Sequence, residues 1–85
     1  MAQIEIYTTR ICPFCIAAKK LLGEKQVSYD EIDVGNDIGL RDKMTARANG
    51  AHTVPQIFIN NRHIGGCDDL YRLERDGALD ALLQA

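Results

Sequence analysis

The chain has 85 residues, of which 46% are hydrophobic and 26% charged, and its formal net charge is −2. This length and balance predict one folded domain spanning residues 1–85, and they exclude a disordered chain. The slight acidity leaves no basic surface for nucleic acid, and no apolar run is long enough to cross a bilayer, so we expect neither nucleic acid nor a membrane as a partner.

Cysteine usage points to a reducing compartment. The N-terminal residues lack the apolar stretch of a secretory signal peptide. Three cysteines are an odd number, which suits a disulfide-stapled secreted domain poorly. We therefore expect a cytoplasmic protein, in which a C-x-x-C pair is catalytic or metal-binding rather than structural.

The first predicted elements are a strand and a helix. Residues 3–7 alternate polar and apolar side chains, which is typical of a short strand. Pro13 suits the first position of a helix, because its missing N–H would have no partner there. An apolar helical face follows at i, i+3, i+4, i+7 and i+8 spacing, formed by Phe14, Ala17, Ala18, Leu21 and Leu22. The charged residues, Lys19 among them, are expected to face away, and the helix to end near 23–26.

The middle of the chain repeats this order. Residues 27–34 predict a second strand, which the sequence at 35–37 interrupts. A second helix follows, and residues 49–50 end it. Its apolar face carries Leu40, Met44 and Ala48.

The last third predicts a hairpin and a helix. Residues 55–59 form a short, strongly apolar strand, and Asn60 and Asn61 suit a tight turn. Residues 62–66 would return antiparallel. Asp68 or Asp69 would then cap a further helix.

A final helical turn at 79–83 would pack on the core. The order strand–helix–strand–helix–strand–strand–helix predicts a small α/β fold: a four-stranded mixed sheet with helices on both faces.

The stretch RICPFC, at residues 10–15, carries the chemistry. Cys12 would stand where the first strand ends and a helix begins, where free N–H groups and the helix dipole stabilise an anion. This setting predicts a nucleophilic thiolate at Cys12, with the N–H groups of Phe14 and Cys15 as donors and Arg10 as a nearby positive charge. Cys15, one turn further on, would be less exposed and would resolve a mixed disulfide on Cys12.

Two other uses of the pair are weaker. A structural zinc site needs two more ligands, and the chain offers only Cys67, His52 and His63, without a second C-x-x-C. We read both histidines as polar surface residues. A permanent disulfide between Cys12 and Cys15 would close a very small loop and stabilise little.

Three motifs together resemble the small bacterial dithiol glutaredoxins. They are CPFC at 12–15, TVPQIFI at 53–59 and GGCDDL at 65–70, and the resemblance covers essentially the whole chain. It implies a thioredoxin-like fold and a thiol–disulfide oxidoreductase. It also implies glutathione as co-substrate, no metal, and reduction of protein disulfides and glutathione mixed disulfides.

The resemblance also assigns roles by position. Cys12 matches the nucleophile and Cys15 the resolving thiol. The expected glutathione-binding positions are Thr53, Val54 and Pro55, with a cis Val54–Pro55 bond, and Gly66, Cys67, Asp68 and Asp69 around the γ-glutamyl end. A residue before proline is extended, which would leave the Val54 backbone free to pair with a peptide.

The chain departs from the family pattern at two positions. Thr9 stands where the family often has lysine, and Phe14 where it usually has tyrosine. Phe14 is expected to be partly core and partly site. Arg10, Arg41 and Arg47 are the candidates for the glycyl carboxylate of glutathione. We read Cys67 as a small residue rather than a regulatory thiol.

The expected partners follow from the same resemblance. They are glutathione and disulfide-containing or glutathionylated proteins, with ribonucleotide reductase as one target that the family suggests, and the protein would act as a monomer. Two alternatives stay open. The first is an iron–sulfur cluster carrier, which Pro13 and Cys15 disfavour. The second is a redoxin reduced by thioredoxin reductase.

Overall fold

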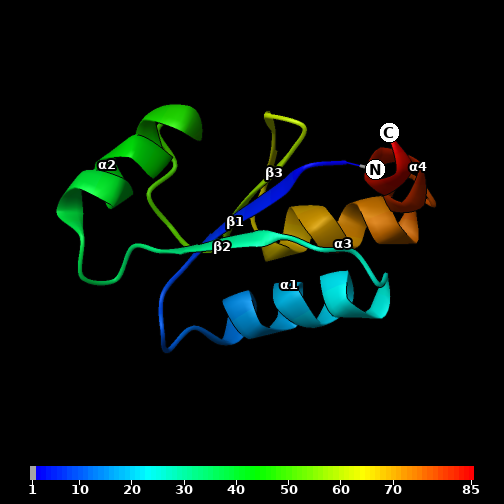
Figure 1. Cartoon of the computed structure of the whole chain (residues 1–85), viewed down its shortest axis with the longest axis horizontal. Coiled ribbons are helices and arrows are strands. Elements are labelled where there is room, and N and C mark those ends of the chain that lie inside the picture. The colour runs from blue at the N-terminus through cyan, green and yellow to red at the C-terminus, as the bar shows by residue number, and fades with distance from the viewer. Residues whose placement is uncertain (1) are drawn as a thin grey trace.

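The computed structural model describes residues 2–85, and within them four strands form one mixed sheet in the order β2–β1–β3–β4 (Figure 1). The strands are β1 (Ile4–Thr8), β2 (Asp30–Asp33), β3 (Gln56–Ile59) and β4 (Arg62–Gly65). β1 pairs with β2 in parallel and with β3 antiparallel, and β3 pairs with β4 antiparallel. This is the mixed sheet that the sequence predicts.

The helices cover both faces of the sheet, as predicted. They are α1 (Pro13–Glu24), α2 (Ile38–Arg47), α3 (Cys67–Arg75) and α4 (Leu79–Gln84). Side chains of α1, α3 and α4 share one buried cluster, whereas Met44 of α2 belongs to a second. Figure 1 shows α1 and α3 on one side of the strands and α2 on the other.

Alternation along the central strands builds the two cores. Ile4 and Ile6 of β1 face α1, α3 and α4, while Tyr7 packs with Phe58 and Met44 under α2. The larger core contains Ile4, Ile6, Ala18, Leu21, Leu22, Ile57, Ile59, Cys67, Leu70, Leu79 and Leu83. Burying each large apolar side chain contributes roughly 1.5–3 kcal/mol, so the larger core fixes α1, which carries the dithiol, against the sheet.

The largest difference from a predicted strand boundary is in β2. The second strand covers only residues 30–33 rather than 27–34, because its ladder with β1 starts at the pair Glu5–Asp30. Val27 and Tyr29 still pack on the larger core, which explains their strand-like pattern.

The last long helix begins earlier than predicted. α3 starts at Cys67 with Gly66 as its N-cap residue, not at Asp68 or Asp69. The Asp69 carboxylate instead reaches back and accepts the Gly66 N–H at 2.9 Å. The acidic residue therefore caps the helix from inside its first turn.

The two ends of the chain are tied together. The Ala2 N–H donates to the Leu83 carbonyl at 3.3 Å, and the Gln3 N–H donates to Asn60 Oδ1 at 2.8 Å. Figure 1 shows the N-terminal segment beside α4, at the opposite end of the molecule from the start of α1. Within residues 2–85, no helix combines the length and the apolarity needed to cross a membrane.

Candidate active site

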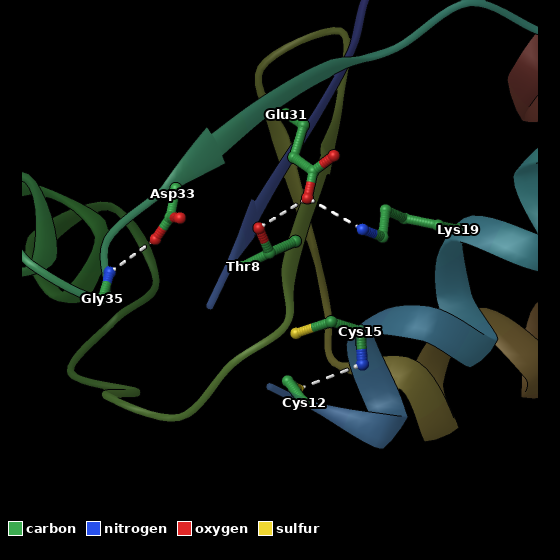
Figure 2. A network of polar contacts seen from close by, with 7 residues as sticks. All are labelled: Thr8, Cys12, Cys15, Lys19, Glu31, Asp33 and Gly35. Atoms are coloured by element: carbon green, nitrogen blue, oxygen red, sulfur yellow. Dashed lines mark hydrogen bonds and ion pairs between the residues drawn. The ribbon is translucent and has the colours of Figure 1, made fainter. Parts of the chain in front are cut away.

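Cys12 occupies the position where the chain leaves β1 and enters α1. It is the N-cap residue of the helix, with extended dihedral angles of −148° and 101°, and Pro13 takes the first helical position. Its Sγ accepts the N–H of Cys15 at 3.1 Å, which Figure 2 draws as a dashed line. The strand–turn–helix setting predicted for the dithiol is therefore confirmed. Of the two predicted backbone donors, both of which the structure describes, Cys15 bonds to the sulfur, whereas Phe14 forms no such bond.

The segment before β3 lies opposite Cys12. The Cys12 thiol points at the carbonyl oxygen of Val54, with a distance of 3.8 Å from Sγ. The Val54–Pro55 peptide bond is cis, as the resemblance implied. Two segments more than forty residues apart in sequence thus meet at the reactive sulfur.

Cys15 is the more deeply buried of the two thiols. It is 1% exposed, whereas Cys12 is 7% exposed, and both are free thiols. Burial, followed by the hydrogen bond with Cys12, raises the pKa of Cys15 to about 12. Cys15 is therefore protonated at neutral pH in the reduced protein, which suits a thiol that acts second.

A pocket of about 500 Å³ lies alongside this dithiol. The predicted residues that line it are Phe14, Thr53, Val54, Pro55, Gly66, Cys67, Asp68 and Asp69, together with Ala51, Gln56, His63 and Gly65. Arg10 is exposed and is not among the lining residues. The structure thus brings together segments around residues 14, 51–56 and 63–69 into one concave surface.

The glycines at the end of β4 shape one wall of the pocket. Gly65 has φ of +120°, a left-handed conformation that side chains rarely adopt, and a Cβ there would collide with the Asp69 carboxylate. That carboxylate holds the Gly66 N–H, so the turn and the start of α3 are locked to each other. The GGCDD segment is therefore needed for the shape of the wall as well as for its polar groups.

Phe14 and Cys67 line the pocket from two helices. Phe14 is 62% exposed, so the prediction that it is partly core is wrong, while its place at the site agrees with the other half of that prediction. The buried residues of α1 begin only at Cys15. Burial, then the charge of Asp68, raises the pKa of Cys67, which keeps this third thiol protonated at neutral pH.

Sequence reasoning missed a polar pair in the wall of the pocket. Gln56 is only 3% exposed, and its Nε2 donates to the carbonyl and the hydroxyl of Thr53 at 3.0 and 3.3 Å. His63 Nε2 lies 2.6 Å from Gln56 Oε1 and donates to it, because an amide oxygen can only accept a hydrogen bond. His63 also lies against the ring of Phe58, so the expectation that it is a plain surface residue is wrong.

The two arginines of α2 have different surroundings. Arg47 donates to both carboxylate oxygens of Glu5, at 3.1 and 3.0 Å, and to the Tyr7 hydroxyl at 2.9 Å. Arg41 donates to the carbonyl of His52 at 2.9 Å, next to the segment that faces Cys12. Arg47 is thus held on the sheet, whereas Arg41 lies beside the segment before β3 that lines the pocket.

Comparison with known proteins agrees with this geometry. The glutaredoxin family model matches residues 4–64. The chain belongs to the glutaredoxin family. It is 51% identical to glutaredoxin 3 of Escherichia coli K12 over 84 residues, which cover 99% of this chain and 100% of that protein.

Solved glutaredoxins share the fold. The solution structure of a Brucella melitensis glutaredoxin matches with a TM-score of 0.86 at 49% identity, over 98% of this chain and 89% of that one. A buckwheat glutaredoxin, solved as a complex with glutathione, matches with a TM-score of 0.87 at 29% identity, over 98% of this chain and 77% of that one. Family and fold together support thiol–disulfide oxidoreductase activity for this glutaredoxin.

Proposed function

We propose that this glutaredoxin uses glutathione to reduce protein disulfides and glutathione mixed disulfides. The observation that carries the proposal is the pocket of about 500 Å³ beside the Cys12–Cys15 dithiol. Its volume lies within the range of about 300–1,000 Å³ that is usual for small-molecule sites. Its walls contain backbone groups and carboxylates that complement a charged tripeptide.

In the proposed reaction, the Cys12 thiolate attacks the glutathionyl sulfur of a mixed disulfide. The bond between the two substrate sulfurs breaks, and the protein substrate leaves as a thiol. A second glutathione then attacks the sulfur bound to Cys12 and leaves as glutathione disulfide, which gives ping-pong kinetics. With a protein disulfide, Cys15 displaces the substrate instead, and two glutathiones reduce the internal disulfide.

Three features support glutathione as the occupant. The extended backbone of Val54 can pair with the central residue of the tripeptide. The N-terminus of α3 can receive the γ-glutamyl carboxylate, and Asp68 is the exposed carboxylate for its ammonium group, because Asp69 is already bound to Gly66. For the glycyl carboxylate we favour Arg41 over Arg47, whose guanidinium is bound to Glu5.

A glutathione-coupled assay tests the proposal. We expect Cys12→Ser to abolish turnover of a glutathione mixed disulfide, because it removes the attacking sulfur. We expect Cys15→Ser to retain that turnover and to lose reduction of protein disulfides. Cys67→Ser is the matched control, because it removes the thiol that lines the adjacent pocket. Equal loss of mixed-disulfide turnover in the Cys12 and Cys15 variants would contradict the division of labour.

The choice of reductant separates this function from its two alternatives. Turnover with thioredoxin reductase and not with glutathione would show that the protein is a redoxin reduced by thioredoxin reductase. Visible absorbance and dimerisation after anaerobic reconstitution with iron and sulfide would indicate a cluster carrier. We propose that the active protein is a monomer in a reducing cytoplasm. Its proposed substrates are disulfide-containing proteins, with ribonucleotide reductase as one of them.

A further inference from the structure

A positive charge lies one helical turn after the resolving thiol. Lys19 follows Cys15 by four positions in α1, so the two side chains share a face of the helix. Figure 2 shows both leaving the helix on the side where Thr8 and Glu31 lie. The expectation that Lys19 faces away from the sheet is wrong, and its side chain is only 29% exposed.

Two strands hold this lysine in place. Its Nζ donates to Glu31 Oε2 on β2 at 2.9 Å, and the hydroxyl of Thr8 on β1 donates to the same oxygen at 2.8 Å. Thr8 is 1% exposed and therefore fixed at the end of its strand. The ammonium group is thus anchored near the buried thiol instead of moving freely in solvent, as most surface lysines do.

The electrostatics around Cys15 change during the reaction. In the reduced protein its pKa is raised by burial, by the hydrogen bond with Cys12 and by the charge of Cys12, and is lowered by the Thr9 backbone and by Lys19. Formation of a mixed disulfide on Cys12 removes two of the causes that raise the pKa of Cys15, namely the charge of Cys12 and the hydrogen bond between the two thiols. Burial then remains the chief obstacle to ionising Cys15, and Lys19 is the charge that opposes it.

We propose that Lys19, held by Glu31 and Thr8, is a positioning residue for the resolving step, in which it stabilises the Cys15 thiolate as that thiolate attacks Cys12. The inference rests on the proposed division of labour between the two thiols. Cys15 loses its proton to solvent, and its sulfur forms a bond with Cys12 Sγ while the bond from Cys12 Sγ to the substrate sulfur breaks. The electron pair leaves with the substrate sulfur, which takes up a proton from water.

The neighbouring groups keep their charges over the useful pH range. Hydrogen bonding to Lys19, and then to Thr8, holds the pKa of Glu31 below its ordinary value, and bonding to Glu31 raises the pKa of Lys19. Tyr29 also acts electrostatically on Lys19. Cys12 acts on Cys15 in the same way, but it is uncharged in the mixed disulfide. The pH dependence of the resolving step near neutrality therefore reports mainly the ionisation of Cys15.

The experiment uses dithiodipyridine, an uncharged disulfide that releases one chromophoric pyridinethione at each thiol attack. Stopped-flow absorbance separates a first release, from attack by Cys12, from a second release, from resolution by Cys15. Every variant carries Cys67→Ser so that two thiols react. Lys19→Met removes the charge and keeps the aliphatic stem, and Lys20→Met removes the same charge from an exposed neighbouring position.

We expect Lys19→Met to slow the second release about twofold and to leave the first unchanged. A partly exposed charge pair changes an equilibrium by roughly two- to fivefold, and the higher nucleophilicity of a more basic thiolate offsets about half of this on a logarithmic scale. The profile of log rate against pH should move to higher pH. Lys20→Met should match the parent protein, and Lys19→Arg should restore the rate.

Two further measurements distinguish an electrostatic role from a structural one. The ratio of the second-release rate in the parent protein to that in Lys19→Met should fall toward one at about 1 M salt, because salt screens the charge of the partly exposed Lys19. In a Cys15→Ser background, Lys19→Met should leave the single remaining release unchanged. An unchanged second release in Lys19→Met, or equal slowing by Lys20→Met, would overturn the proposal. Because the assay contains no glutathione, these outcomes are independent of whether glutathione is the physiological reductant.

Discussion

Removal of the Arg47 side chain should destabilise the fold strongly, although Arg47 lies on the helix with the smaller core. Its guanidinium makes two bonds to Glu5 and one to Tyr7, and it stacks 4.0 Å from the centre of the Phe58 ring. The side chains of Arg47 and Glu5 are 25% and 18% exposed. Arg47→Met would therefore leave a largely buried carboxylate without its partner.

The expected loss is about 2–3 kcal/mol, below the roughly 3–5 kcal/mol for breaking a fully buried pair, because part of this one remains in water. For a domain of this size, that loss corresponds to a decrease in Tm of about 10–20 °C. Urea unfolding followed by circular dichroism measures it, and Lys43→Met, on the exposed side of α2, is the matched control. The double variant with Glu5→Gln should lose less than the sum of the single losses. A loss under about 0.5 kcal/mol, or one equal to the control, would refute the reasoning.

Three further predictions concern stability. Leu22→Ala, at a fully buried position of α1, should cost about 2–5 kcal/mol in urea unfolding; a smaller loss would indicate that the core refills the cavity. Gly23→Ala should stabilise α1 by roughly 0.5–1 kcal/mol, since a Cβ there meets no atom within 4 Å. Gly65→Ala should instead destabilise the protein and raise the KM for glutathione, because a Cβ there would collide with Asp69. Similar effects of the two substitutions would contradict the account of the pocket wall. The pKa of Glu31 lies below its ordinary value of 4.5, so the ionised Glu31 stabilises the fold above pH 4.5, and this stabilisation is lost as the pH falls below that value. The difference in unfolding free energy between the parent and Glu31→Gln should therefore be constant from about pH 6 to 8 and become smaller in acid. A difference that does not depend on pH would show that the ion pair is not the cause.

Much of this fold could be predicted because local signals agree with the tertiary structure. Pro13 and the spacing of Leu21 and Leu22 define α1, since one helix face must be buried against the sheet. The pair Asn60 and Asn61 marks the hairpin, and both residues adopt the positive φ that the turn requires. The position of the dithiol follows directly from these elements.

What could not be predicted depends on contacts between distant segments. The polar bonds of Gln56 to Thr53 and His63 are hidden in sequence, because all four residues of β3 are buried and alternation gives no signal. Lys19 looked like a solvated charge because its partner, Glu31, lies on β2, a different element of the chain. Both cases involve polar groups whose partners become neighbours only after the chain folds.

The hydrogen bond between Ala2 and Leu83 has a practical consequence for engineering. The start of β1 and the end of α4 lie side by side, away from Cys12 (Figure 1). A reporter domain attached at either end would therefore project from the far side of the molecule and leave the thiols accessible. A short glycine-rich bridge could likewise join the two ends into a ring, and the chain could then be reopened at a surface turn to give a circularly permuted redox module.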